Sequence, residues 1–210
     1  KAQVRMQQTM QRVGLPSEWV KLLSAEQASK VLGTQTQFPA LLFEQGGWLY
    51  PKAVVQQCLN HPNIKLIKQS KVTDFYQLND TNKTQPNWEV KTLKDTHQAP
   101  VLVIATGSLE ERLNERLGLP IRPVKGQVTH LRNNQQQQTL NKAVTHGGYS
   151  VSMPNGAVTG ATFEAPDMSQ NLSEESHLHN LSMTSKSLPN WINKAIKATD
   201  VVGRVAFRPT

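Results

Sequence analysis

Short apolar segments of strand length, separated by polar and glycine-containing connections, fill the middle of this 210-residue chain. They lie at residues 64–67, 72–78, 88–93, 101–105, 121–131, 144–145, 149–153 and 157–162. Asn155-Gly156 connects the last two, and this dipeptide supplies the positive φ angles of a tight hairpin turn. Apolar segments of this length between turn residues predict strands. The middle of the chain is therefore expected to form sheets.

Helices are predicted on both sides of these strands. Residues 3–13 carry a loose helical stripe, and Ser24 with Gln27 forms a capping box that begins a second helix ending near Gly33. Pro51 suits the first turn of a third helix. Ser173 precedes a fourth helix, which ends before residue 189. Helices that flank a strand-rich middle place the chain in the mixed α/β or α+β class.

Composition limits the kind of protein this can be. The chain has 23 Lys and Arg against 15 Asp and Glu, a difference of +8, and its pI of about 9.7 favours a polyanionic partner. The apolar fraction of 37% lies far above that of a disordered chain. Its apolar runs are much shorter than the roughly 18 residues of a membrane span. Cys58 is the only cysteine and no leader is recognisable, so a reducing, cytoplasmic setting is expected.

Conventional catalytic motifs are missing from the sequence. It contains no Cys-x-x-Cys, His-Glu-x-x-His, Gly-x-Ser-x-Gly or P-loop pattern. His177 and His179 are two positions apart, so on a helix they face different ways, and a solvated surface is expected for them rather than a shared metal. The remaining feature is residues 101–105, expected as a buried strand that runs into Thr106-Gly107. Open α/β sheets bind cofactors at such strand ends.

Six segments, taken in order, resemble the signature segments of the glycine oxidase and D-amino acid oxidase family of flavoproteins. They are Gly46 to Pro51, Lys71 to Phe75, Ala105-Thr106-Gly107, Pro120 to Gln127, Tyr149 to Pro154 with Gly160 to Glu164, and Phe207 to Thr210. Within this family, Gly-Gly-Trp-Leu-Tyr-Pro and Leu-Pro-Ile-Arg-Pro-Val-Lys-Gly-Gln-Val are most similar to the FAD-dependent half of the bifunctional enzymes that complete 5-methylaminomethyl-2-thiouridine in tRNA.

The resemblance implies a fragment of a two-domain FAD-dependent oxidase fold, with a mixed antiparallel substrate-domain sheet and part of the flavin-binding domain. Residues 1–50 are expected to form a helical and substrate-domain segment, 51–107 part of the FAD-binding domain, 108–203 the substrate-binding domain and 204–210 a strand returning toward the FAD domain. The family's Gly-x-Gly-x-x-Gly motif is expected before Lys1. We therefore expect a piece of a longer protein, which by itself binds FAD weakly or not at all.

The resemblance also implies a reaction. The carboxymethylaminomethyl group on the wobble uridine of tRNA would be oxidised with FAD to aminomethyluridine, with release of glyoxylate. A methyltransferase, which uses S-adenosyl-L-methionine, is expected to be fused N-terminally in the full-length protein. Two alternatives stay open: a glycine or sarcosine oxidase that acts on free amino acids, and a noncatalytic interaction domain on the same scaffold.

Site residues follow from the same resemblance. Arg208 matches the family's carboxylate-binding arginine, for which a bidentate guanidinium is suited, and Tyr149 matches a tyrosine near the substrate. The cofactor-binding residues implied for FAD are Val72, Ala105, Thr106, Gly107, Arg122 and Gln127. Without the resemblance, these residues are also compatible with a surface arginine, a core aromatic, polar edge-strand residues and ordinary strand packing. No metal site is expected.

Binding of tRNA is expected to involve basic residues of the chain. Phosphate contacts are the main source of nucleic-acid affinity that does not depend on sequence. The candidate residues are Lys65, Lys68, Lys71, Lys83, Lys91 and Lys94. Scattered lysines are also typical of a solvated surface, and the sequence contains no aromatic-interleaved basic motif of an RNA-binding module.

Overall fold

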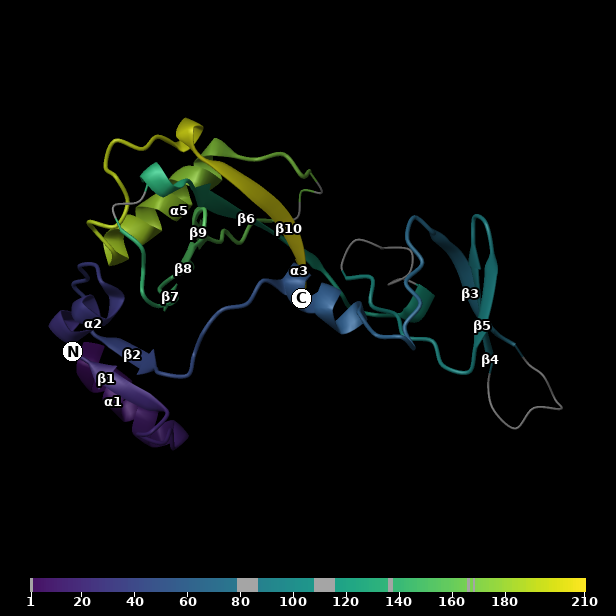
Figure 1. Cartoon of the computed structure of the whole chain (residues 1–210), viewed down its shortest axis with the longest axis horizontal. Coiled ribbons are helices and arrows are strands. Elements are labelled where there is room, and N and C mark those ends of the chain that lie inside the picture. The colour runs from purple at the N-terminus through teal and green to yellow at the C-terminus, as the bar shows by residue number, and fades with distance from the viewer. Residues whose placement is uncertain (1, 79–86, 108–115, 136–137, 166, 168) are drawn as a thin grey trace. The chain divides into compact units, whose positions relative to one another are not determined.

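A computed structural model describes residues 2–78, 87–107, 116–135, 138–165, 167 and 169–210 of the chain. Its contacts divide the chain into two compact units: residues 1–48 with 107–210 form unit 1, and residues 49–106 form unit 2. Figure 1 shows the helices and strands of both units. Because both combine helices with antiparallel strands, the predicted α/β (α+β) class is confirmed.

Unit 1 contains a five-stranded antiparallel sheet (Figure 1). Its strands, in spatial order, are β10 (Val202–Pro209), β6 (Pro123–Leu131), β9 (Gly156–Gly160), β8 (Tyr149–Met153) and β7 (Val144–Thr145). β10 pairs with β6 along its whole length. Met153 lies opposite Gly156 at the predicted Asn-Gly hairpin, which is thereby confirmed.

One face of this sheet packs against α5 (Glu174–Ser187), and we call it the helix face. Gln127 of β6 exchanges two hydrogen bonds with the backbone of Ser173, the residue that caps α5. Two positions along β6, Thr129 lies 2.9 Å from His177 of the same helix. Because side chains alternate along a strand, residues 124, 126 and 128 face the other way.

The opposite face carries two arginines of β10. Residues paired across antiparallel strands share a face. Arg204 lies opposite Val128 and Arg208 opposite Val124, so both arginines lie on the face away from α5. Tyr149 lies there too, because its neighbour Ser150 hydrogen-bonds on the helix face. We call this side of the sheet, defined by Tyr149, Arg204 and Arg208, the arginine face.

The hydrophobic core of unit 1 lies on the helix face. Its buried members are Leu32, Leu131, Leu140, Ala157, Leu181, Leu188, Trp191, Ile192 and Val201. Trp191 is fully buried, and its Nε1 donates a 2.9 Å hydrogen bond to the carbonyl oxygen of Gln138. Two short 3-10 helices, η1 (Asn133–Gln135) and η2 (Ala198–Asp200), complete this side. This cluster therefore packs against the sheet from the helix face.

The first part of unit 1 forms a small helix–strand assembly. Its elements are α1 (Ala2–Val13), β1 (Val20–Leu23), α2 (Ala25–Leu32) and β2 (Ala40–Phe43), and β1 pairs with β2. The predicted capping box is confirmed, since Ser24 and Gln27 exchange side-chain to backbone hydrogen bonds of 2.9 and 3.2 Å. Gly33 ends α2 at φ 74°, a left-handed conformation that glycine adopts without strain.

Unit 2 contains one helix and a three-stranded antiparallel sheet. They are α3 (Pro51–Leu59), β3 (Val72–Leu78), β4 (Asn87–Thr92) and β5 (Thr96–Ala99), with the strands in this order. Phe75 is buried, and its ring lies 6.3 Å from that of Trp88. The predicted helix at Pro51 and two of the predicted strands are confirmed, whereas β5 was not predicted.

Residues 64–67 and 101–105 are not strands, and that prediction is wrong. Residues 101–105 were expected to be buried, but Val101 is 70% and Val103 is 80% exposed. An apolar segment becomes a buried strand only where another segment pairs with it and covers it. Neither segment finds such a partner among the described residues. In the same described part of the chain, no helix is long and apolar enough to span a membrane.

Candidate functional site

Arg208 holds its guanidinium over Gly126 of the neighbouring strand. A Cβ atom at position 126 would lie 2.7 Å from Nη1 and 2.9 Å from Nη2 of Arg208, and 2.7 Å from the backbone carbonyl oxygen of Thr162, so glycine leaves room for this arrangement. Nη1 donates a 3.3 Å hydrogen bond to the carbonyl oxygen of Thr162. Cζ lies 4.2 Å from the ring centroid of Phe163, a cation–π contact.

No carboxylate of the described residues pairs with the half-buried guanidinium of Arg208. Its neighbours are a neutral carbonyl group and an aromatic ring. Guanidinium groups form strong bidentate pairs with carboxylates. The positive charge of Arg208 is therefore available to an anionic ligand.

The segment at residues 162–164 is fixed from the helix face. The backbone of Glu164 forms an isolated antiparallel β-bridge with Lys125 of β6. Its side-chain Oε1 accepts hydrogen bonds from Thr162 (2.5 Å) and Ser176 (2.6 Å). Lys125 Nζ lies 2.9 Å from Asp167 Oδ2 and 4.0 Å from Glu164 Oε2, and its side chain is 5% exposed. The buried charge of Lys125 is thus neutralised within the protein.

These contacts lower the pKa values of two carboxyl groups. Burial raises the pKa of Glu164, but hydrogen bonds from Ser176 and Thr162 and the charge of Lys125 outweigh it, so the pKa ends below its ordinary value. The hydrogen bond from Lys125, followed by that from the Ser169 backbone, lowers the pKa of Asp167. Both carboxyl groups are ionised at neutral pH.

Tyr149 shares the arginine face with Arg208 but lies at another point on it. Through Gly160 and Val128, Tyr149 is in register with Arg204. Arg204 precedes Arg208 by four positions, roughly 13 Å along a strand. The side chain of Tyr149 is 37% exposed, so it is not the core aromatic that was the alternative. The two residues predicted to contact the substrate therefore lie on one surface.

Gln127 lies on the helix face and is fully buried. Nε2 donates to the carbonyl oxygen of Ser173, and Oε1 accepts from its N–H, both at 2.7 Å. Its backbone N–H donates to Thr162 Oγ1, and its carbonyl oxygen accepts from Asn180 Nδ2. These bonds attach the start of α5 to β6, and a contact between Gln127 and FAD stays a prediction.

Arg122 is exposed just before β6. Its backbone exchanges two hydrogen bonds of 2.9 Å with Thr210, which continues the ladder of β6 and β10 by one pair. The side chain has no partner among the described residues. Its predicted contact with FAD stays a prediction.

The other residues predicted to bind FAD lie in unit 2 or at its boundary. Val72 begins β3 and is 50% exposed. Ala105 and Thr106 belong to no helix or strand and are exposed, and Gly107 has φ 72° with nothing within 4 Å of an added Cβ. The backbone of residues 101–106 makes no hydrogen bond within the described part of the chain. Unpaired main-chain groups beside a glycine fit a cofactor that is held through backbone contacts.

Most of the predicted tRNA-binding lysines lie on the surface of unit 2. The exposed ones are Lys65, Lys68, Lys71, Lys91 and Lys94, while Lys83 lies outside the described residues. Lys91 Nζ lies 5.0 Å from the ring centroid of Tyr76. Their part in binding tRNA stays a prediction.

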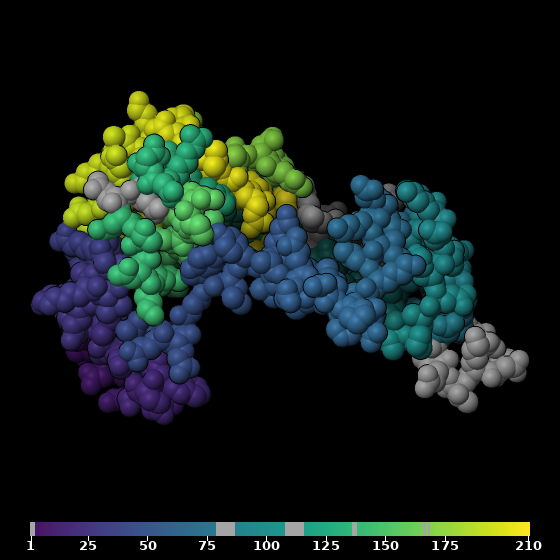
Figure 2. All heavy atoms as spheres, in the orientation of Figure 1, coloured from purple at the N-terminus to yellow at the C-terminus, as the bar shows by residue number. Residues whose placement is uncertain are grey.

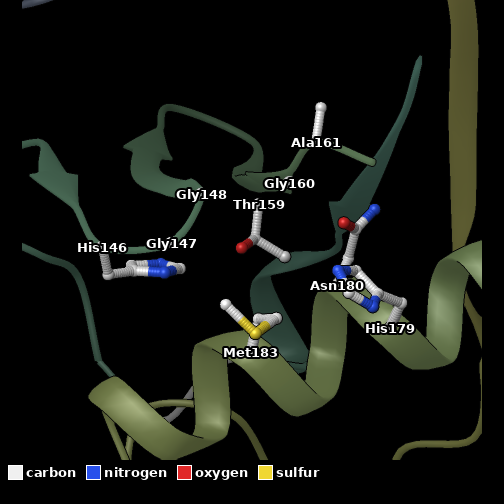
Figure 3. Close-up of a pocket in the computed structure, with 9 residues that line it drawn as sticks. All are labelled: His146, Gly147, Gly148, Thr159, Gly160, Ala161, His179, Asn180 and Met183. Carbon is white, nitrogen blue, oxygen red and sulfur yellow. The ribbon is translucent and has the colours of Figure 1, made fainter. Parts of the chain in front are cut away.

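A small pocket, open in part to solvent, lies on the helix face, between α5 and the turn before β8 (Figure 3). His146, Gly147, Gly148, Thr159, Gly160, Ala161, His179, Asn180 and Met183 line it. His146 Nε2 lies 2.9 Å from Ser150 Oγ, whereas its buried Nδ1 has no partner in the described structure. Burial lowers the pKa of this imidazole. None of the predicted site residues lines this pocket.

His177 was expected on a solvated helix surface, and that prediction is wrong. It is 4% exposed because α5 turns it toward β6, where Nδ1 lies 2.9 Å from Thr129 Oγ1. Burial lowers its pKa, while the charge of Glu174 raises it and that of His130 lowers it further. The described residues contain no group of three or more potential metal ligands.

Sequence reasoning gave no role to Gly126, Thr162 or Phe163, which surround Arg208. One signal was available, because a glycine inside a strand often marks a close approach by another group. Which group approaches Gly126 depends on the pairing of β6 with β10, and the sequence does not show that register.

A sheet face that presents an arginine without a carboxylate partner, beside a strand glycine, is suited to an anionic ligand. Residues 1–210 match the family described as DAO, FAD dependent oxidoreductase, and the chain belongs to that family. It is 43% identical over 212 residues to the tRNA 5-methylaminomethyl-2-thiouridine biosynthesis bifunctional protein MnmC of Hydrogenovibrio crunogenus, covering 98% of this chain and 31% of that protein. Identity to the protein of the same name from Methylobacillus flagellatus is 28% over 205 residues, covering 97% and 31%. The chain thus spans about a third of these relatives.

Solved structures show the same fold. The glycine oxidase of Geobacillus kaustophilus superposes with a TM-score of 0.70 at 19% identity, covering 96% of this chain and 53% of that one. The L-alpha-glycerophosphate oxidase of Mycoplasma pneumoniae, solved with FAD bound, gives 0.73 at 16% identity, covering 99% and 58%. The predicted FAD-dependent oxidase fold and family resemblance are confirmed.

Proposed function

We propose that this chain belongs to an enzyme that oxidises the carboxymethylaminomethyl group on the wobble uridine of tRNA. The substrate amine loses two electrons to become an imine, which water hydrolyses to aminomethyluridine and glyoxylate. The family supports the oxidation, and the names of the relatives support tRNA as the substrate. Such an enzyme would act in the cytoplasm.

The main structural support for this proposal is the guanidinium of Arg208, which has no carboxylate partner among the described residues. The substrate group is an N-substituted glycine, so it presents one carboxylate. Thr162 and Phe163 hold Arg208 without neutralising it, and Gly126 leaves the space in which it lies. We assign to Arg208 the binding of that carboxylate, which orients the reacting carbon and nitrogen.

FAD, when bound, supplies the two-electron oxidation, because no side chain of the chain can accept electrons in this way. In this chain, FAD would be held through backbone contacts. The residues that would make them are Val72, at the start of β3, and Ala105-Thr106-Gly107, where unit 2 ends. Tyr149 would contact the substrate on the arginine face. Unit 2, close to the expected range 51–107, is the proposed FAD-binding part, and unit 1 the proposed substrate-binding part.

The rest of the full-length protein would complete the FAD site. These 210 residues contain no Gly-x-Gly-x-x-Gly motif, and the relatives are about three times as long. We propose that additional strands pair with residues 64–67 and 101–105, which would bury their apolar side chains. A fused methyltransferase that methylates the exposed amine agrees with the word bifunctional in the relatives' names.

The test uses the full-length protein purified with its flavin. Hypomodified tRNA, free glycine and sarcosine are each supplied, and modified nucleosides and glyoxylate are measured. Conversion of the tRNA nucleoside with release of glyoxylate, lost in Arg208→Gln, supports the proposal. Faster turnover of a free amino acid than of tRNA would support the alternative oxidase. Protein that purifies without flavin and changes no substrate would point to a noncatalytic domain.

A further inference from the structure

The positively charged side chains of the five-stranded sheet differ in environment between its two faces. The strands β6, β7, β8, β9 and β10 contain no Asp or Glu, and their charged residues are Lys125, Arg204 and Arg208. Lys125 lies on the helix face, buried and paired with two carboxylates. Arg204 and Arg208 lie on the arginine face, and neither has a carboxylate partner among the described residues. The arginine face is therefore positive.

Arg204 has no role in the site described so far. It is exposed, and its side chain makes no hydrogen bond to any described residue. Burial lowers the pKa of His130, and the positive charge of Arg204 lowers it further. Arg204 therefore acts electrostatically on this neighbouring strand. An arginine without an internal partner on a face free of acidic strand residues is complementary to an anion.

The spacing of the two arginines distinguishes between possible ligands. Four positions on β10 separate their Cα atoms by roughly 13 Å. One amino acid spans only about 3.8 Å between neighbouring Cα positions. A free glycine whose carboxylate is held at Arg208 therefore ends well before Arg204. A nucleotide chain whose modified base is held at Arg208 extends beyond that point and carries phosphates with it.

We propose that Arg204 binds a backbone phosphate of the tRNA whose modified uridine is held at Arg208. This inference rests on the proposed function, and it identifies the arginine face as the surface on which tRNA lies. Phosphate contacts position a nucleic acid without reading its sequence. The forked guanidinium of arginine suits phosphate oxygens.

The surroundings of Arg204 leave it accessible. Val202, two positions earlier on the same face, is 50% exposed, and Tyr149 is 37% exposed. Figure 2 shows the last residues of the chain, coloured yellow, at the surface of unit 1. Tyr149 lies in the same row of the sheet as Arg204 but three strands away, roughly 14 Å, so its aromatic ring is placed to contact another nucleotide of the bound tRNA.

The experiment compares Arg204→Gln, Arg204→Lys and the matched control Arg12→Gln in the full-length, flavin-loaded protein. Arg12 is an exposed arginine of α1, away from the sheet. Two substrates are used: hypomodified tRNA, and the free carboxymethylaminomethyluridine nucleoside, which has no phosphate. Dissociation constants for tRNA are also measured by fluorescence anisotropy over a range of salt concentrations.

For Arg204→Gln we expect the KM and Kd for tRNA to rise about tenfold. The slope of log affinity against log salt should become shallower by about 0.7 to 0.9, the loss of one phosphate contact. Turnover of the free nucleoside should not change. Arg204→Lys should recover most of the tRNA affinity, and Arg12→Gln should resemble the wild type on both substrates.

Two results would overturn the role of Arg204 alone. One is unchanged tRNA affinity in Arg204→Gln, and the other is an equal loss on tRNA and free nucleoside, which indicates a structural effect. A wild-type protein that binds no tRNA and converts neither substrate overturns the proposed function together with this inference. Failure of the proposed function is seen in the wild-type protein itself, whereas failure of the Arg204 role is seen only in the Arg204→Gln variant. The two failures are therefore distinguishable.

Discussion

The guanidinium of Arg208 and the backbone of Gly126 fit together across β10 and β6. Nη1 and Nη2 would lie only 2.7 and 2.9 Å from a Cβ atom at position 126, and the carbonyl oxygen of Thr162 would lie 2.7 Å from it. Side-chain carbons do not approach other atoms this closely. The glycine therefore fixes where the proposed carboxylate-binding group lies.

Gly126→Ala should displace Arg208 and weaken substrate binding. Because the added methyl group also meets the Thr162 carbonyl oxygen, we expect the free energy of unfolding to fall by about 1–3 kcal/mol, as in other overpacked sites. The KM of the full-length enzyme should rise at least tenfold. Urea unfolding and steady-state kinetics measure the two effects.

Gly47→Ala is the matched control for this change. An added Cβ at position 47 meets nothing within 4 Å, and the residue is exposed. Its effect on the free energy of unfolding should stay within about 0.5 kcal/mol. If Gly126→Ala behaved like Gly47→Ala in both measurements, the close fit of Arg208 and Gly126 would not exist in solution.

Arg208→Lys should separate charge from geometry. The lysine keeps the positive charge but loses the fork that pairs two carboxylate oxygens. A charge-assisted hydrogen bond contributes about 1.5–3 kcal/mol, so kcat/KM should fall about 10- to 150-fold. The Tm should change little, since Arg208 forms no ion pair with described residues. Wild-type kcat/KM in this variant would remove Arg208 from the site.

Lys125→Met should weaken the protein in a way that depends on pH. Lys125 helps to lower the pKa values of Glu164 and Asp167 below their ordinary 4.5 and 3.8. A lowered carboxyl pKa adds stability that is complete above the ordinary value and is lost as the pH falls through the folded value. The variant should therefore have a lower Tm than the wild type at pH 7, with the difference shrinking below pH 4.

The same loss should not appear in Lys186→Met, a change at an exposed lysine in the last turn of α5. Thermal unfolding followed by circular dichroism from pH 3 to 7 compares the two variants with the wild type. A constant Tm difference between Lys125→Met and the wild type over this range would mean that packing, and not the ion pairs, accounts for the loss.

Features that depend on neighbouring residues were predictable from the sequence. The capping box of Ser24 and Gln27 and the Asn155-Gly156 hairpin each lie within a few residues, so local hydrogen bonds decide them. Burial of His177 was not predictable, because it depends on which side of α5 meets the sheet. The fit of Arg208 over Gly126 joins two distant segments and requires the strand register.

Segment 101–105 shows the limit of reading burial from composition. Its apolar residues predicted a buried strand, yet burial requires a partner that the described residues do not supply. The arginine that carries the proposed function was found only because its surrounding segment resembles a family pattern. Its lack of an internal carboxylate partner, on which the proposal depends, is a property of the folded sheet.

Val103→Asp tests whether the rest of the full-length protein covers this segment. In the 210-residue chain Val103 is 80% exposed, so the free energy of unfolding should change by less than about 0.5 kcal/mol. In the full-length protein, where additional strands are proposed to bury it, the carboxylate would be desolvated. We expect a clear loss of stability and of flavin per protein.

Leu93→Asp, at a residue 76% exposed after β4, is the control and should change neither protein. Because only burial by added chain distinguishes the two sites, full flavin content in Val103→Asp would show that residues 101–105 remain exposed in the whole enzyme.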